Sequence, residues 1–206
     1  MEKPHLEFLV EEPSMEAFLY KLLPRLFPED CPSFRVHAFQ GKPDLLDKLQ
    51  ARLKGYAHWP SNYGRIVVVV DCDDDDCHKL KQQLENAATT AGLSTRSGAG
   101  GAPWQVVNRI AIEELEAWYF GDWEAVRCAY PKVSRTVPNQ AKYRDPDAIK
   151  GGTWEAFERL LKKKGYFKNG RSKVEIARTI AAHINPDCNR SHSFIKFRDA
   201  LIETMA

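Results

Sequence analysis

The sequence predicts an α/β protein: a central, mostly parallel sheet flanked by helices, followed by a C-terminal helical extension. Strand-like and helix-like segments alternate through about the first 120 residues, a pattern typical of crossover connections between parallel strands. The run from Val67 to Val70 does not alternate with polar residues, so both of its faces should be buried, as in a central parallel strand. Beyond residue 121 the signals are helical only. We therefore expect an α/β core at residues 1–121 and a basic helical extension packed on it at residues 122–206.

The individual elements follow from hydrophobic spacing and from the residues that interrupt it. Short apolar runs predict four strands, at residues 6–10, 34–39, 65–70 and 104–110. Apolar residues at helical spacing, such as Leu45, Leu49 and Leu53, predict the intervening helices. The helices of the core are expected to begin at Ser14 and to span residues 44–54, 78–91 and 112–120. Those of the extension are expected at residues 123–130, 153–164, 172–183 and 193–204.

Charge is distributed unevenly along the chain. Residues 1–130 hold 14 Lys and Arg against 20 Asp and Glu, and residues 131–206 hold 16 against 8. An acidic first part joined to a basic second part suits a metal site beside a surface that attracts a polyanion. Solvated charged faces of ordinary helices would explain the same asymmetry.

Cysteine usage and hydropathy bear on the compartment. The five cysteines, at positions 31, 72, 77, 128 and 188, include no CxxC pair, so we expect reduced thiols and a cytoplasmic protein. The apolar run around Val67 to Val70 is far shorter than the roughly 20 residues that span a bilayer. The N-terminus lacks the features of a secretion signal, and we expect no membrane association.

Carboxylates follow two of the predicted strands. Glu11 and Glu12 come after the first strand, and Asp71 and Asp73 come at the end of the valine-rich strand. The carboxyl ends of parallel strands are where such sheets bind ligands. Clustered carboxylates repel one another unless a cation lies among them, and Mg²⁺ or Mn²⁺ prefers oxygen ligands. The alternative role for part of the aspartate run is helix capping, with Asp74 or Asp76 as the candidates.

A third acidic cluster precedes Trp118. Glu113 and Glu116 are three residues apart and would share one face of a helix that begins at residue 112. Glu116 is therefore a candidate site residue, although acidic residues also favour the first turn of any helix. Trp118 is expected in the core.

These motifs resemble the TOPRIM domain of topoisomerases, primases, recombination proteins and certain nucleases. The first TOPRIM signature is similar to Leu9-Val10-Glu11-Glu12-Pro13-Ser14-Met15-Glu16, with Glu12 where the signature usually has glycine, and the second to Asp71-x-Asp73. Further stretches resemble small stand-alone bacterial TOPRIM-like proteins. They are Glu116-x-Trp118, Pro146-Asp147-Ala148-Ile149, Gly152-Thr153-Trp154-Glu155 and Asn189-Arg190-Ser191-His192-Ser193-Phe194.

The resemblance implies a four-stranded Rossmann-like sheet and Mg²⁺ bound at Glu11, Asp71 and Asp73, with Glu116 as a further acidic residue. It implies metal-dependent cleavage of nucleic acid. It also implies an ABC-type ATPase partner in bacterial defence against phage.

We therefore expect a metal-dependent nuclease that acts on DNA or RNA. The expected catalytic residues are Glu11, Asp71, Asp73 and Glu116, and the expected ligands of Mg²⁺ or Mn²⁺ are Glu11, Asp71, Asp73 and Asp75. Nucleic acid is expected to contact Lys163, Lys168, Arg171, Lys173, Arg190 and Ser193. Arg190 and Ser193 precede a helix N-terminus, which can bind an anion, but Ser193 could equally cap that helix. The alternative is a non-catalytic binding module that regulates an ATPase, in which Glu12 and the crowded aspartates prevent metal binding.

Overall fold

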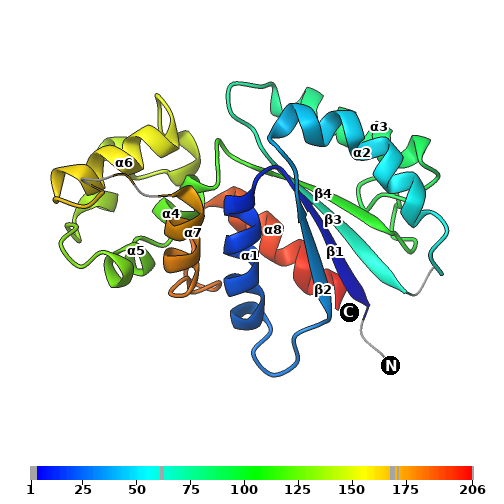
Figure 1. Cartoon of the computed structure of the whole chain (residues 1–206), viewed down its shortest axis with the longest axis horizontal. Coiled ribbons are helices and arrows are strands. Elements are labelled where there is room, and N and C mark those ends of the chain that lie inside the picture. Colours follow the sequence, from blue (N-terminus) through cyan, green and yellow to red (C-terminus); the bar gives the residue numbers. More distant parts are fainter. Residues whose placement is uncertain (1–3, 61–62, 168–169, 171, 206) are drawn as a thin grey trace.

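A computed structural model describes residues 4–60, 63–167, 170 and 172–205. Its centre is a four-stranded sheet in the order β2-β1-β3-β4, in which every neighbouring pair is parallel. The strands are β1 (His5–Val10), β2 (Phe34–Ala38), β3 (Gly64–Asp71) and β4 (Val106–Ala111). Because helices flank this sheet on both faces, the predicted fold class is confirmed (Figure 1).

The helices lie close to their predicted positions. Those of the α/β part are α1 (Pro13–Leu26), α2 (Lys42–Tyr56), α3 (Cys77–Thr90) and α4 (Glu116–Gly121). Those that follow are α5 (Trp123–Ala129), α6 (Thr153–Lys163), α7 (Lys173–Ala181) and α8 (His192–Thr204), with 3-10 turns at Val137–Asn139, Ala141–Tyr143 and Pro146–Ala148. None of the helices in the described part of the chain has the length and apolar composition needed to cross a bilayer.

The valine-rich strand β3 separates two hydrophobic cores. Val67 and Val69 pack into one core, and Val68 and Val70 pack into the other. In Figure 1, α1 and α8 lie on one face of the sheet and α2 and α3 on the opposite face. All four valines are fully buried, which is the reason that this strand shows no polar alternation.

The second half of the chain shares the larger core. One cluster of buried side chains joins α1 and the sheet to α4, α5, α6, α7 and α8. Trp118 lies at its centre, fully buried, with its ring 4.9 Å from that of Phe197 and 5.6 Å from that of Phe18. Its indole N–H donates to the Ser193 hydroxyl at 2.9 Å. Trp118 is thus a core residue, as predicted.

The largest departure from prediction follows β4. The helix expected from residue 112 begins only at Glu116, so Glu113 lies in the connection and not on a helical face shared with Glu116. The carboxylate of Glu114 accepts hydrogen bonds from the Thr153 hydroxyl at 2.9 Å and the Trp154 backbone N–H at 2.8 Å. This connection is therefore tied to the start of α6, a distant partner that local periodicity does not reveal.

Candidate functional site

The carboxyl edge of the sheet brings together acidic side chains from three segments. Glu11 follows β1, Asp71 ends β3 and Glu116 begins α4. The Glu11 carboxylate accepts a hydrogen bond from the Asp71 backbone N–H at 3.1 Å. The charges of Glu11 and Glu116 both act on the Asp71 carboxyl. Three acidic residues that are distant in the chain therefore form one acidic centre.

Burial makes ionisation of this acidic centre costly. The exposed fraction is 8% for Asp71 and 3% for Glu116. Burial, reinforced by the charges of Glu11 and Glu116, raises the pKa of Asp71 well above its usual range. Burial also raises the pKa of Glu116 to about 8, although the positive charge of Lys173 opposes this shift. Burial likewise raises the pKa of Glu11, against the effect of its backbone hydrogen bond. A cation that approached these groups would relieve the cost.

Lys42 binds the aspartate loop that follows β3. Its ammonium lies 2.7 Å from Asp73 and 2.8 Å from Asp75, and it donates to the backbone carbonyl of Cys72 at 3.1 Å. Burial alone would lower the pKa of Lys42, but the two aspartates raise it. Asp73 and Asp75 were predicted as metal ligands, and here an internal cation pairs with both.

Sequence reasoning did not single out Lys42. The available signal was its position as the first residue of α2, where the helix dipole disfavours a cation. A buried lysine at that position indicates a specific anionic partner elsewhere in the chain. Asp76, by contrast, caps α3 by accepting from the N–H groups of His78 and Lys79, as predicted for one member of the aspartate run.

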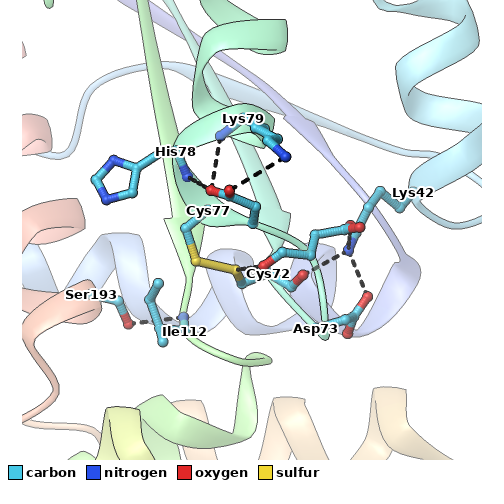
Figure 2. The surroundings of a disulfide bond; sticks show 10 residues. Lys42, Cys72, Asp73, Cys77, His78, Lys79, Ile112 and Ser193 are labelled. Atoms are coloured by element: carbon cyan, nitrogen blue, oxygen red, sulfur yellow. Dashed lines mark hydrogen bonds and ion pairs between the residues drawn. A yellow bond between two sulfur atoms is a disulfide. The ribbon is translucent and has the colours of Figure 1, made fainter.

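A disulfide joins the two ends of the same loop. Cys72 and Cys77 are five positions apart in sequence, with their Cα atoms 5.9 Å apart, within the usual range for a disulfide. In Figure 2 this bond lies between the Asp73–Lys42 pair and the side chain of His78. The expectation of reduced cysteines is wrong for this pair, because only CxxC spacing was considered. The loop that carries the aspartates is thus held by a disulfide and by Lys42.

An open cleft of about 470 Å³ adjoins the aspartate loop. Its acidic lining residues are Asp73, Asp74, Glu113, Glu114 and Glu155, and its remaining lining residues are Gly151 and Gly152. Burial and the neighbouring carboxylates raise the pKa of Glu113. The cleft is therefore negatively charged, and the charges of its lining residues Asp73 and Glu114 act on Asp71 and Glu116 of the acidic centre.

Lys173, predicted as a nucleic-acid contact, lies near Glu114 of this cleft. It is the first residue of α7, and its ammonium is 4.9 Å from the centre of the Trp154 ring and 4.0 Å from Glu114. Burial would lower its pKa, but the charge of Glu116, followed by those of Glu12 and Glu114, raises it. Lys173 therefore supplies a second internal cation to the acidic side chains.

The other predicted nucleic-acid contacts differ in exposure. Lys163 and Arg190 are exposed, whereas Lys168 and Arg171 fall outside the described residues. Ser193 is 8% exposed and bonds within the chain.

The helix N-terminus near Arg190 and Ser193 already holds an anionic side chain. Asp147 accepts from the backbone N–H groups of His192 and Ser193 and from the hydroxyls of Ser191 and Ser193. Ser191, not Ser193, caps α8. The anion site expected there is thus filled from within the chain.

The donor chemistry of the acidic centre fits a hard divalent cation. Within the described residues, no three His, Cys, Asp or Glu side chains are grouped so that they could hold a metal ion. Two of the four predicted ligands, Asp73 and Asp75, pair with Lys42 instead. The side chains at hand are nevertheless carboxylates, which Mg²⁺ and Mn²⁺ prefer. Burial and neighbouring negative charges raise the pKa values of Glu11 and Asp71, and a bound cation would oppose this shift. Glu11, Asp71, Asp73 and Asp75 are the residues that would hold such an ion.

Comparison with known proteins identifies a family but no activity. A family model described as a domain of unknown function (DUF4276) matches residues 10–202. No curated protein and no solved structure matches the chain.

Proposed function

We propose that this chain, which belongs to the DUF4276 family, is a hydrolase that depends on a divalent metal and cleaves phosphodiester bonds of DNA or RNA. The observation that supports the proposal is the convergence of Glu11, Asp71 and Glu116 at the carboxyl edge of a parallel sheet. Ligands bind at this edge in α/β sheets. The resemblance of the strand-end motifs to TOPRIM nucleases supports the same chemistry.

Each group of residues has a distinct part in this proposal. Glu11, Asp71, Asp73 and Asp75 would hold Mg²⁺ or Mn²⁺, which when bound supplies positive charge to a phosphate undergoing hydrolysis. Lys173 would bind a substrate phosphate oxygen, because the charges of Glu116 and Asp71 act on its ammonium. The acidic cleft would repel a polyanion in the absence of metal, so substrate binding at the centre would depend on the bound cation.

Cleavage assays with matched aspartate variants test the proposal. Purified protein is incubated with labelled single- and double-stranded DNA and RNA in Mg²⁺, in Mn²⁺ and in EDTA. Asp71→Asn should lower the cleavage rate at least about 100-fold, since even residues behind a metal ligand are worth about 10- to 100-fold. Asp76→Asn is the control: it removes the same charge from the same loop but keeps the cap, which Asn also provides. Equal activity of the two variants, or no cleavage of any substrate by the wild type, would refute the proposal.

A second candidate function is supported by Lys42. An ammonium that already pairs with Asp73 and Asp75 can replace a metal ion in stabilising the loop. The chain would then be a non-catalytic binding subunit, and an ABC-type ATPase is the partner that the TOPRIM resemblance suggests.

Calorimetry with Mn²⁺ separates the two functions. Wild type and Lys42→Ala are titrated, with Lys48→Ala, another lysine of α2, as the control. Binding at millimolar metal by the wild type favours the hydrolase. If Lys42→Ala binds Mn²⁺ but the wild type does not, the second candidate is favoured, because the Lys42 ammonium then occupies the position of the metal ion.

A further inference from the structure

A second groove, opposite in charge to the acidic cleft, lies between α3, β4 and α8. Its volume is about 350 Å³, and its lining includes Lys81, Arg109 and Lys196 together with His78 and His192. No carboxylate is among its lining residues. It runs along β4, which is an edge strand of the sheet. The groove therefore gathers cationic side chains from three elements that are far apart in sequence.

The guanidinium of Arg109 is only partly used by the protein. Its Nη1 donates to the Asn108 carbonyl at 3.3 Å, while its Nε is buried without a hydrogen-bond partner in the described residues. Burial, followed by the charge of Arg96, lowers its pKa to about 10, against the opposing effect of Glu203, Glu85 and Asp199. Buried polar groups are rarely left unpaired in proteins. Arg109 is therefore a donor that lacks an acceptor.

Of the carboxylates near the groove, Glu85 already pairs with two of the groove's lining residues. Glu85 pairs with Lys81 at 2.8 Å and accepts from the Asn108 side chain at 2.9 Å. Glu203 pairs with Arg96 on the surface. Lys196 is exposed and forms no ion pair among the described residues. Lys81 is thus paired within the chain, and Arg109 and Lys196 are the cations of the groove that remain for an anion that enters from solvent.

Residues of the groove and the Asp73–Lys42 ion pair lie on opposite sides of the disulfide in Figure 2. Figure 2 shows His78, Ile112 and Ser193 on one side of the Cys72–Cys77 bond and Lys42 and Asp73 on the other. Ile112 lines the basic groove, and the next residue, Glu113, lines the acidic cleft. A single extended ligand could therefore contact both the basic groove and the acidic cleft.

We propose that the basic groove binds the phosphate backbone of a nucleic-acid strand, next to the position where the acidic centre would cleave it. The proposal rests on the proposed hydrolase function for its substrate class. A polymer is favoured over a small phosphate compound because the groove is open and extends along β4, and its cations come from separate elements. Lysine and arginine contacts of this kind hold the backbone without reading sequence.

Binding in EDTA tests the groove without cleavage. Fluorescence anisotropy measures the affinity of labelled single- and double-stranded oligonucleotides for wild type, Lys196→Ala and Lys54→Ala at several salt concentrations. Lys196 and Lys54 are both exposed helical lysines, but only Lys196 lines the groove. Loss of one phosphate contact lowers the salt slope by about 0.7 to 0.9, which makes binding about tenfold weaker at about 50 mM salt and nearly equal at about 1 M.

The outcomes separate this proposal from the proposed function. Weaker binding by Lys196→Ala but not by Lys54→Ala supports the groove, even if no nucleic acid is ever cleaved in metal. Equal binding by both variants overturns the groove, whatever Asp71→Asn does to cleavage. Competition with inorganic pyrophosphate decides the ligand class: an oligonucleotide that binds no more tightly than pyrophosphate would overturn the assignment to a nucleic-acid backbone.

Discussion

Replacing Glu116 with Gln is expected to stabilise the metal-free protein, by an amount that grows with pH. Glu116 is 3% exposed, and burial raises its pKa from 4.5 to about 8. Between these two values the folded state binds more protons than the unfolded state. The free energy of unfolding therefore falls as pH rises through this window, and the loss is complete only above about pH 8. Gln keeps the shape of the side chain but cannot ionise, so the variant avoids this loss.

The size of the effect follows from the pKa difference. Each unit of difference corresponds to about 1.4 kcal/mol. Relative to wild type, the stabilisation of Glu116→Gln should be below about 1 kcal/mol near pH 5, about 3 kcal/mol near pH 7 and on the order of 5 kcal/mol above pH 8. Such gains are large beside the 5–15 kcal/mol that is typical of whole domains.

Urea denaturation in EDTA, monitored by circular dichroism between about pH 5 and pH 9, gives the free energy of unfolding at each pH. The decisive quantity is the difference between variant and wild type, since the titrating groups that do not interact with Glu116 cancel in it. Glu124→Gln, at an exposed position on α5, is the control and should change the free energy of unfolding by less than about 1 kcal/mol. A difference for Glu116→Gln that stays constant across this range, or a variant less stable than wild type at pH 8, would refute the reasoning.

Three further predictions concern the contacts that hold the site. Lys42→Ala should lower the free energy of unfolding by about 1–3 kcal/mol, because one carbonyl and two carboxylates lose their contact with the Lys42 ammonium. Lys48→Ala is the control and should lower it by less than about 1 kcal/mol, because the ion pair of Lys48 with Asp44 is partly exposed. Urea denaturation measures both variants. Asp147→Ala should cost about 1–3 kcal/mol by the same measurement, because the start of α8 loses four hydrogen bonds, and a loss below about 0.5 kcal/mol would contradict this. Reduction of the Cys72–Cys77 bond should cost about 2 kcal/mol, as expected for a short closed loop; an unchanged melting temperature with both thiols demonstrably free would argue against it.

The fold could be predicted because its determinants are local. Val67 to Val70 indicate a doubly buried strand without any knowledge of neighbours, and β3 indeed has a core on each face. Helical spacing likewise places Leu45, Leu49 and Leu53 in one core. Prediction was wrong where a distant residue decides the structure. The segment after β4 has helical composition, but Glu114 binds the start of α6, and the helix begins later.

In the candidate site, too, the local features could be predicted and the distant partners could not. Strand ends could be predicted, and parallel strands bring their ends to one edge, so the meeting of Glu11 and Asp71 follows from topology. The positive partners could not be predicted from local pattern. Lys42 lies 29 positions before Asp71 in the sequence, and no spacing rule connects it to the aspartate loop. Asp147 similarly reaches α8 from a 3-10 turn more than 40 positions away.

The two internal cations indicate where further positive charge would act. Lys42 compensates Asp73 and Asp75, and the charge of Lys173 acts on Glu116. The carboxylate of Asp71 forms no ion pair with any described residue, and the negative charges of Glu11 and Glu116 disfavour its ionisation. A cation that binds beside Asp71 and Glu11 needs to displace neither lysine, whereas one that binds Asp73 or Asp75 must compete with Lys42. The proposed metal ion would therefore bind most easily at the Glu11–Asp71 pair. Lys42 would continue to neutralise Asp73 and Asp75, and Lys173 would continue to act on Glu116.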